Sequence, residues 1–244
     1  KNTVKNTTDL VTKIKDIEIP NGSTLTSFDI KNLYTIVPID ETIEVLNKKL
    51  KEAKLLTEKQ IKEIIELTKL IVKQNYFQFN GIFYQQNEGL AMGSPISSIL
   101  SEIFLQDLEE KKILNNNKYC NNIIYWWRYV DNVICLYKGN TRQINIFENY
   151  LNSIHKSIEF TTEIETKNSI NYLDLTITKQ NNKHNFKIYK KPTQSDQIIN
   201  NKSYHPGSQK MAAFNSMTHR LINIPMNKED YLNETNTIKY IAHQ

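Results

Sequence analysis

Two aspartates that lie far apart along the chain each accompany residues that favour β-strands. Asp29 ends the run Thr24-Leu-Thr-Ser-Phe-Asp, and Asp131 lies between the two apolar runs of 126–137, where Asp131 and Asn132 form the expected hairpin turn. A carboxylate that loses water needs a cation or a hydrogen-bond donor. If the two strand ends meet, the like charges repel, and a divalent cation between them offsets that cost.

The segment Gly89-Leu-Ala-Met-Gly-Ser-Pro95 is the second candidate for chemistry, because small residues let a backbone approach a ligand closely. Two carboxylates beside such a loop are the arrangement that nucleotidyl transfer needs. In that reaction one Mg²⁺ lowers the pKa of the attacking hydroxyl and a second steadies the leaving pyrophosphate. Ser94 and Pro95 also predict a helix start, with or without a nucleotide beside them.

Periodicity and turn signals predict the elements that must position these residues. Single strands are expected at 24–30, 158–165, 170–178 and 184–190. Hairpins are expected over 123–137 and over 76–86, where Asn80-Gly81 is a strong turn signal. Helices are expected from Asp40 to about 50, and at 57–73, 95–113, 142–155, 209–221 and 228–241.

The helix starts carry capping signals of their own. We expect Asp40 to cap the first helix, and Thr57 with Gln60 to form a capping box on the second. The order of the elements is typical of an α+β fold with helices on one face of an antiparallel sheet. Such a fold places the end of the first strand beside the tip of the hairpin, so Asp29 and Asp131 become neighbours.

Composition narrows the class of protein. The 244 residues suffice for one large domain or a domain with a small appendage, and a net charge of +5 with a pI near 8.9 mildly favours a polyanionic partner. Most basic residues are lysines, which suit contacts with a phosphate backbone. The two cysteines indicate a reducing compartment, and no apolar run reaches the ~18–20 residues of a membrane span. Without an initiator Met or signal peptide, the sequence reads as a piece of a longer chain.

Several ordered motifs resemble those of reverse transcriptases in the form used by Penelope-like retroelements. Residues 27–38 (Ser-Phe-Asp-Ile-Lys-Asn-Leu-Tyr-Thr-Ile-Val-Pro) resemble motif A, residues 89–95 motif B, and Arg128-Tyr-Val-Asp-Asn132 motif C. Residues 148–165 and 171–175 are similar to the motif D and motif E regions. The segments 189–196 and 203–206 look like the stretch that follows the palm in that family, so the resemblance covers about residues 8–244.

The resemblance implies a fold and an activity. It implies a right-hand polymerase palm with partial fingers over residues 1–185 and a helical, thumb-like or helix-turn-helix segment over 186–244. The activity would be RNA-directed DNA polymerisation with Mg²⁺ or Mn²⁺, adding deoxynucleotides to a DNA primer on an RNA template. No membrane partner is implied, and the protein would be intracellular and act in the nucleus.

The resemblance also assigns roles to single residues. Asp29 and Asp131 become metal ligands. Asn132 stands where the family usually has a second catalytic Asp, so it is either a weak outer ligand or a simple turn residue. Tyr34 becomes a steric gate that rejects a 2′-hydroxyl. Gly89, Gly93, Ser94 and Pro95 would position the template or nucleotide. A primer grip would include Leu173 and Asp174.

Plainer interpretations remain open for the same residues. Asp29 and Asp131 also suit turns, Tyr34 and Leu173 suit a core, and Arg128 would pair with an acid as readily as with a phosphate. Lys156 is either a solvated side chain or a proton donor to pyrophosphate, and only one of Trp126 and Trp127 can face inward. Asn132, with the absence of upstream fingers motifs and of a downstream GIY-YIG nuclease, favours a decayed nucleic-acid-binding remnant as the alternative function. A protein–protein scaffold with fortuitous motifs is a third.

Overall fold

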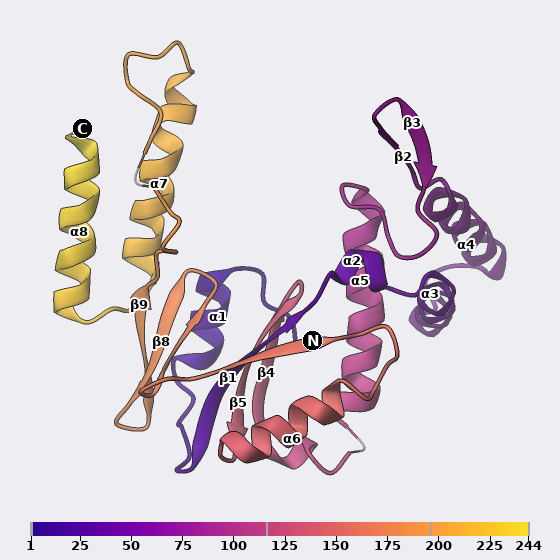
Figure 1. Ribbon diagram of the computed structural model, residues 1–244, viewed down its shortest axis with the longest axis horizontal. Helices are drawn as coiled ribbons and strands as arrows, with labels where there is room; N and C mark the ends of the chain where they lie inside the picture. Colours follow the sequence, from indigo (N-terminus) through magenta and orange to yellow (C-terminus); the bar gives the residue numbers. More distant parts are fainter. Residues whose placement is uncertain (1, 116, 196, 244) are drawn as a thin grey trace. The chain divides into compact units, whose positions relative to one another are not determined.

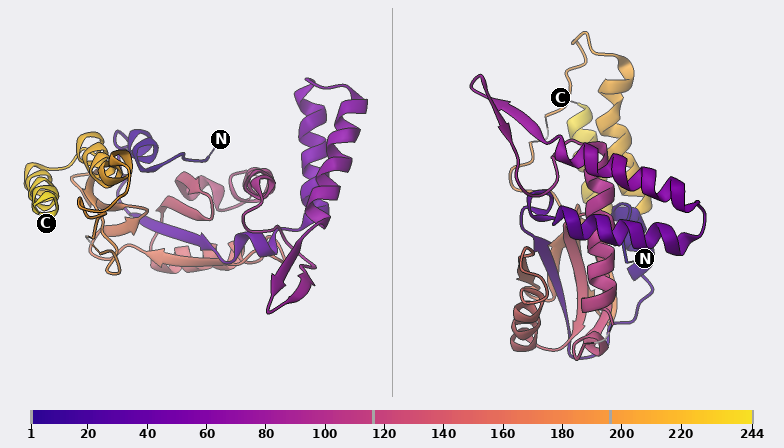
Figure 2. Two further views of the ribbon diagram at one scale, coloured as in Figure 1. Left: turned by 90° about the horizontal axis from the view of Figure 1, so that it is seen from above. Right: turned by 90° about the vertical axis from the view of Figure 1, so that its right-hand side faces the viewer.

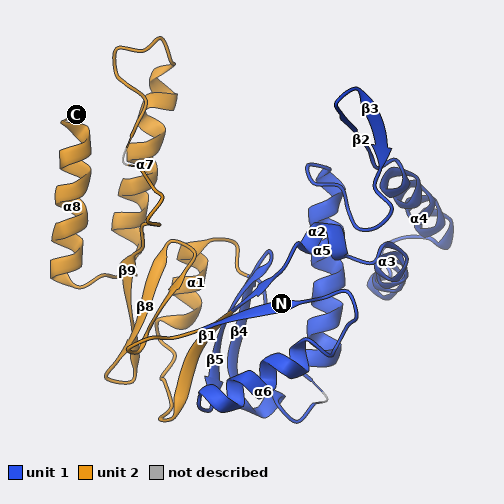
Figure 3. Ribbon diagram, in the orientation of Figure 1, with its two compact units in different colours: residues 1–3, 28–163 blue, residues 4–27, 164–244 orange. Residues whose placement is uncertain are grey.

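The structure is a computed structural model that describes residues 2–115, 117–195 and 197–243 (Figure 1, with two further views in Figure 2). The chain divides into two compact units (Figure 3): unit 1 contains residues 1–3 and 28–163, and unit 2 contains residues 4–27 and 164–244. Strand β1 (Ser23–Ile30) begins in unit 2 and ends in unit 1. The predicted boundary between residues 185 and 186 stays a prediction.

Unit 1 is built on a sheet with the strand order β4-β5-β1-β6. Besides β1, the strands are β4 (Ile123–Tyr129), β5 (Asn132–Lys138), β6 (Phe160–Ile164) and, in a separate two-stranded sheet, β2 (Tyr76–Phe79) and β3 (Ile82–Gln85). The helices are α2 (Leu33–Ile36), α3 (Ile39–Ala53), α4 (Glu58–Lys73), α5 (Pro95–Leu108), α6 (Thr141–Leu151), the π-helical turn η1 (Glu109–Ile113) and the 3₁₀ turn η2 (Cys120–Asn122).

An aromatic cluster forms the centre of unit 1. Phe28 of β1 stacks on Trp126 of β4 with ring centroids 5.4 Å apart, and Phe147 of α6 meets Phe28 edge-on at 5.8 Å. Such ring pairs add about 0.5–1.5 kcal/mol each beyond the burial of their area. Trp126 also donates a hydrogen bond to Glu109 of η1, so α6 and η1 cover the same face of the sheet. The α+β class with helices on one sheet face is therefore confirmed.

Two further parts of unit 1 form as the sequence predicts. Helices α3 and α4 lie side by side (Figure 2), and α4 begins with a capping box in which the Thr57 amide donates to Gln60 Oε1 at 2.9 Å. The β2–β3 hairpin turns at Asn80 and Gly81, whose φ angles are +48° and +78°. Both φ values are those of a turn that Asn-Gly adopts without strain, so local sequence alone accounts for this hairpin.

The described residues of unit 2 form a second antiparallel sheet and three helices. Its strand order is β7-β8-β9, with β7 (Ser169–Tyr172), β8 (Leu175–Gln180) and β9 (Lys183–Ile188). The helices are α1 (Thr7–Ile14), α7 (Gly207–Asn223) and α8 (Lys228–Ala242), and the last two contain the predicted helices 209–221 and 228–241. Within the described residues, no helix is both long enough and apolar enough to cross a membrane.

Two local predictions were wrong, and a third holds in its bounds but not in its helix type. Asp40 does not cap α3, because the helix begins at Ile39 and the N-cap position is Pro38. The predicted strand 170–178 is a hairpin, since the chain reverses after Tyr172 and Leu173 has a φ of +53°. The predicted helix 95–113 is α-helical only to Leu108 and then widens into η1, which the i→i+5 bond from the Leu114 amide to the Glu109 carbonyl closes at 2.9 Å.

Candidate active site

The ends of two strands bring Asp29 and Asp131 together in unit 1. Neighbouring residues of a strand face opposite sides of the sheet, so Asp29 lies on the face away from its neighbour Phe28. The Ile30 amide donates to the Asp131 carbonyl oxygen at 3.0 Å, which fixes the tip of the β4–β5 hairpin beside the end of β1. Both aspartates are half-buried. The predicted convergence of these two residues is therefore present.

Electrostatics distinguish Asp29 from an ordinary surface acid. Burial raises the pKa of Asp29 above its usual value, and the neighbouring Asp131 carboxylate raises it further. Among the described residues, no basic side chain offsets either effect. A carboxylate pair with this unfavourable interaction fits a divalent cation, because the cation would remove the repulsion.

The candidate metal site has only two acidic protein ligands. The described residues contain no cluster of three or more His, Cys, Asp or Glu side chains that would bind a metal ion by themselves. Mg²⁺ commonly binds one or two carboxylates and takes its remaining ligands from water and substrate phosphates. The pair Asp29 and Asp131 fits that pattern.

The hairpin turn differs by one residue from the prediction. Tyr129 pairs with Asn132, so the two turn residues are Val130 and Asp131, and Asn132 is the first residue of β5. Val130 has a φ of +55°, a conformation that β-branched residues rarely adopt. The side-chain amide of Asn132 donates to Asp131 Oδ1 at 3.4 Å. Asn132 thus offers Asp131 a hydrogen bond where a second Asp would repel it.

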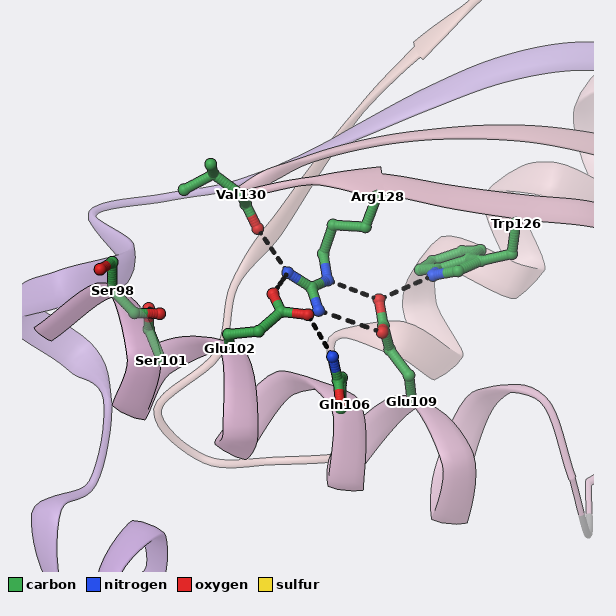
Figure 4. Close-up of polar contacts among 8 residues, drawn as sticks. All are labelled: Ser98, Ser101, Glu102, Gln106, Glu109, Trp126, Arg128 and Val130. Carbon is green, nitrogen blue, oxygen red and sulfur yellow. Dashed lines mark hydrogen bonds and ion pairs between the residues drawn. The ribbon is translucent and has the colours of Figure 1, made fainter. Parts of the chain in front are cut away.

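A buried arginine supports this turn from the helix-covered face of the sheet (Figure 4). Arg128 is only 1% exposed, and its Nη1 donates to the Val130 carbonyl oxygen at 2.9 Å. Its Nε and Nη2 donate to the two carboxylate oxygens of Glu109 at 2.8 and 3.3 Å, and Nη1 also reaches Glu102 Oε2 at 2.7 Å. Glu109 in turn accepts from the Trp126 indole at 2.9 Å.

The contacts of Arg128 decide two interpretations that the sequence left open, and they add two residues to the candidate site. Arg128 pairs with acids, and Trp126 is the inward-facing member of the tryptophan pair. Burial lowers the pKa of Arg128, but the charges and hydrogen bonds of Glu109 and Glu102 together outweigh it, so the pKa lies above its ordinary value. The sequence analysis missed Glu102 and Glu109. Their spacing of seven residues puts both on one side of a helix, which was the available signal.

The loop 89–95 packs directly against the segment that follows Asp29. The Leu90 amide donates to the Tyr34 carbonyl oxygen at 2.5 Å. Gly89 has a φ of +74°, and a Cβ built on it would lie 2.3 Å from the Thr35 carbonyl oxygen. Any side chain at position 89 would therefore collide with backbone as well as strain its own. This contact brings the predicted site residues Tyr34 and Gly89 together.

Comparison with known families agrees with this geometry. Residues 2–177 match the family model described as reverse transcriptase (RNA-dependent DNA polymerase). The chain belongs to the reverse transcriptase family. The match includes Asp29, the loop 89–95 and Asp131. A second family model, described as an animal helix-turn-helix domain, matches residues 197–244.

Solved telomerases share the fold of this reverse transcriptase chain. The telomerase from Candida albicans, solved with the TWJ fragment of telomeric RNA, is 16% identical with a TM-score of 0.68, and the match covers 99% of this chain and 43% of that one. Apo telomerase from Candida tropicalis is 13% identical with a TM-score of 0.60, covering 98% and 45%. The chain thus spans less than half the length of these telomerases, and the likeness concerns the fold alone. No curated protein matches the sequence.

The other predicted residues of motifs A and B in this reverse transcriptase lie on α2 and at the start of α5. Tyr34 is half-buried on α2, the short helix that follows β1. Ser94 is the N-cap and Pro95 the first residue of α5, as predicted, although the Ser94 side chain makes no capping bond. Gly93 has a φ of +89° with open space around a built Cβ, so conformation, not crowding, favours glycine there.

The remaining predicted residues of this reverse transcriptase lie in loops. Leu173 and Asp174 form the β7–β8 turn in unit 2, and Leu173 is half-buried there, so their role as a primer grip stays a prediction. Asp174 Oδ2 lies 3.7 Å from Arg220 Nη1. Lys156 is exposed in the loop after α6. Asp196, the last residue of the segment 189–196, lies outside the described residues.

Proposed function

We propose that this chain is the RNA-directed DNA polymerase domain of a Penelope-like retroelement. It would extend a DNA primer on an RNA template with deoxynucleotides and would work in the nucleus. The observation that carries the proposal is the convergence of Asp29 and Asp131 beside a tightly packed glycine loop. The family match over residues 2–177 supports the general activity, and the order of motifs, with the segments 189–196 and 203–206, supports the Penelope-like assignment.

The proposed chemistry is nucleotidyl transfer with divalent cations. Asp29 and Asp131 would hold Mg²⁺, or Mn²⁺ in its place. The bound ions would lower the pKa of the primer 3′-hydroxyl and neutralise charge on the leaving pyrophosphate. The raised pKa of Asp29 matches this role, because its carboxylate gains most when a cation replaces the repulsion from Asp131.

Other residues would position the substrate. Tyr34 lies on α2 directly after the metal-binding strand, where its ring would exclude a 2′-hydroxyl and so select deoxynucleotides. The loop 89–95 is held to the Tyr34 and Thr35 backbone, which would fix the nucleotide-contacting residues relative to Tyr34. The helical segment of unit 2 would grip the template–primer duplex through backbone phosphates.

The decisive experiment measures incorporation of deoxynucleotides on an RNA template with an annealed DNA primer. The wild-type chain is expected to extend the primer with Mg²⁺ or Mn²⁺, and Asp29→Ala is expected to lose incorporation to background. Asp40→Ala is the matched control, because Asp40 is an exposed acid in the first turn of α3. Equal incorporation by wild type and Asp29→Ala would refute the assignment.

Asn132 favours a second candidate function, a catalytically decayed protein that still binds nucleic acid. Asn132 keeps an oxygen but carries no charge, and its amide nitrogen is the group that bonds to Asp131. This candidate predicts duplex binding that weakens steeply with salt and no incorporation by wild type or by Asn132→Asp. Incorporation that rises in Asn132→Asp would count against decay and in favour of a weakened polymerase.

A further inference from the structure

We propose that Arg128 is the positioning residue for Asp131: it holds the Val130–Asp131 turn in a strained shape that presents the Asp131 carboxylate beside Asp29. The inference rests on the proposed function, in which these two carboxylates bind the metal ion. Arg128 touches neither a metal nor a substrate in this assignment. It acts through the Val130 carbonyl group.

The guanidinium of Arg128 is held in place by Glu109 and Glu102, independently of its bond to the turn. Two of its nitrogens bond to the two oxygens of Glu109, at 2.8 and 3.3 Å, and Nη1 bonds to Glu102 at 2.7 Å. A planar group whose three nitrogens all bond to carboxylate oxygens has little freedom to rotate. The remaining bond, from Nη1 to the Val130 carbonyl oxygen at 2.9 Å, therefore points at a defined place.

The turn needs such support because its own residues do not favour it. Val130 has a φ of +55° and is 41% exposed, so neither backbone preference nor burial stabilises its conformation. The strain must be offset by contacts from elsewhere in the fold. Two hydrogen bonds flank the turn, from Arg128 to the Val130 carbonyl and from the Ile30 amide to the Asp131 carbonyl at 3.0 Å.

The two hydrogen bonds that hold the turn connect it to elements on which other proposed site residues lie. The Ile30 amide follows Asp29 directly on β1. Glu102 lies on α5, the helix that begins at Ser94 and Pro95, and Glu109 begins η1 at the end of that helix. The position of Asp131 is thus set between the strand of Asp29 and the helix that starts at the loop 89–95.

Two variants test the proposal without leaving the buried Glu109 carboxylate unpaired. Arg128→Lys keeps the positive charge beside Glu109 but cannot serve both acids and the carbonyl with a planar fork. The double variant Arg128→Met with Glu109→Gln removes both buried charges together and leaves an acceptor for the Trp126 indole. Removing a buried pair as a unit is often tolerated, so this variant is expected to fold. Arg142→Lys, on the exposed surface of α6, is the control.

The first readout is hydrogen exchange of the Ile30 amide in EDTA, measured by NMR. This amide bonds to the Asp131 carbonyl, so its protection reports the position of the turn without any metal or activity. Exchange is expected to be about tenfold faster in both test variants, as for loss of a charge-assisted hydrogen bond, and unchanged in Arg142→Lys. Unchanged Ile30 exchange in folded test variants would overturn the proposal.

The second readout is Mn²⁺ affinity, measured by titration calorimetry with Asp29→Ala as the reference for lost binding. Both test variants are expected to bind Mn²⁺ about 10–100-fold more weakly than wild type, the usual cost of losing support behind a metal ligand. Wild-type affinity in the test variants would contradict the positioning role. If wild type and Asp29→Ala bind Mn²⁺ equally, the proposed function fails, whereas faster Ile30 exchange would still uphold the support of the turn by Arg128.

Discussion

Unit 1 contains two hairpins that reverse the chain in two residues, and they are held in opposite ways. The β2–β3 hairpin turns at Asn80-Gly81, and every residue of both its strands is exposed. The β4–β5 hairpin turns at Val130-Asp131, and most of β5 is buried. The first turn uses residues that prefer positive φ, whereas the second forces a β-branched residue into it.

The two turns show that backbone conformation is set by local sequence in one hairpin and by distant contacts in the other. Phe77 stacks on Tyr84 across the β2–β3 hairpin at 5.4 Å, so that hairpin uses contacts within itself. The β4–β5 turn depends on Arg128, Glu109 and the amide of Ile30. Strain of this kind gathers at functional sites, where the surrounding fold over-determines an unfavourable conformation.

The largest expected effect comes from removing the support of the β4–β5 turn. Arg128→Met leaves the Glu109 carboxylate buried without its partner, and the free energy of unfolding should fall by about 3–5 kcal/mol. Chemical denaturation measures this loss. The exposed substitution Arg142→Met should stay within about 0.5 kcal/mol of wild type. Equal losses in the two variants would mean that the β4–β5 turn needs no special support.

The matching change in the other hairpin should act only locally. Gly81→Ala places a Cβ at a φ of +78°, which should destabilise the β2–β3 hairpin by about 1–2 kcal/mol. Hydrogen exchange of the 76–85 amides should accelerate while the global melting temperature stays constant, because the hairpin is exposed. A fall in global stability would show that β2–β3 is not an independent element.

Relieving the strained residue should have a smaller effect of opposite sign. Val130→Gly removes a Cβ strain of about 1–2 kcal/mol at the cost of about 0.5–1 kcal/mol of added chain entropy. The free energy of unfolding should therefore rise slightly, unlike that of most Val→Gly substitutions. A clear loss of stability on denaturation would indicate that the Val130 side chain itself supports the turn.

The smallest effect should be the pH dependence contributed by Asp29. Because its folded pKa is raised, the folded state binds a proton more readily than the unfolded state, and stability falls as pH rises from the ordinary pKa of Asp through the folded one. In EDTA at neutral pH, Asp29→Asn should melt at a higher temperature than wild type, and the gap should close at low pH. The β2–β3 hairpin has no charged residue, so it contributes no such pH dependence of stability.

Sequence predicted those features that neighbouring residues specify. The capping box at Thr57 and the Asn80-Gly81 turn form as predicted. The convergence of Asp29 and Asp131 followed from the order of elements, because it needs only the topology of the sheet. Their roles in binding a metal ion stay a prediction.

Features that depend on distant contacts were missed or misplaced. The turn at Val130 was placed one residue late, because Asp-Asn is the better local turn and the Arg128 contact that stabilises the observed one comes from outside the hairpin. The reversal at Leu173 was also missed, because leucine rarely adopts the positive φ that it has there. The partners Glu102 and Glu109 read as ordinary helix-surface acids until the fold buries Glu109.

The close packing of Gly89 has a genetic consequence. Because the Thr35 carbonyl occupies the space of a Cβ, every missense mutation of that codon damages the contact between the segments of Asp29 and Ser94. Across homologous sequences we therefore expect glycine to persist at position 89 while exposed positions such as Met92 vary.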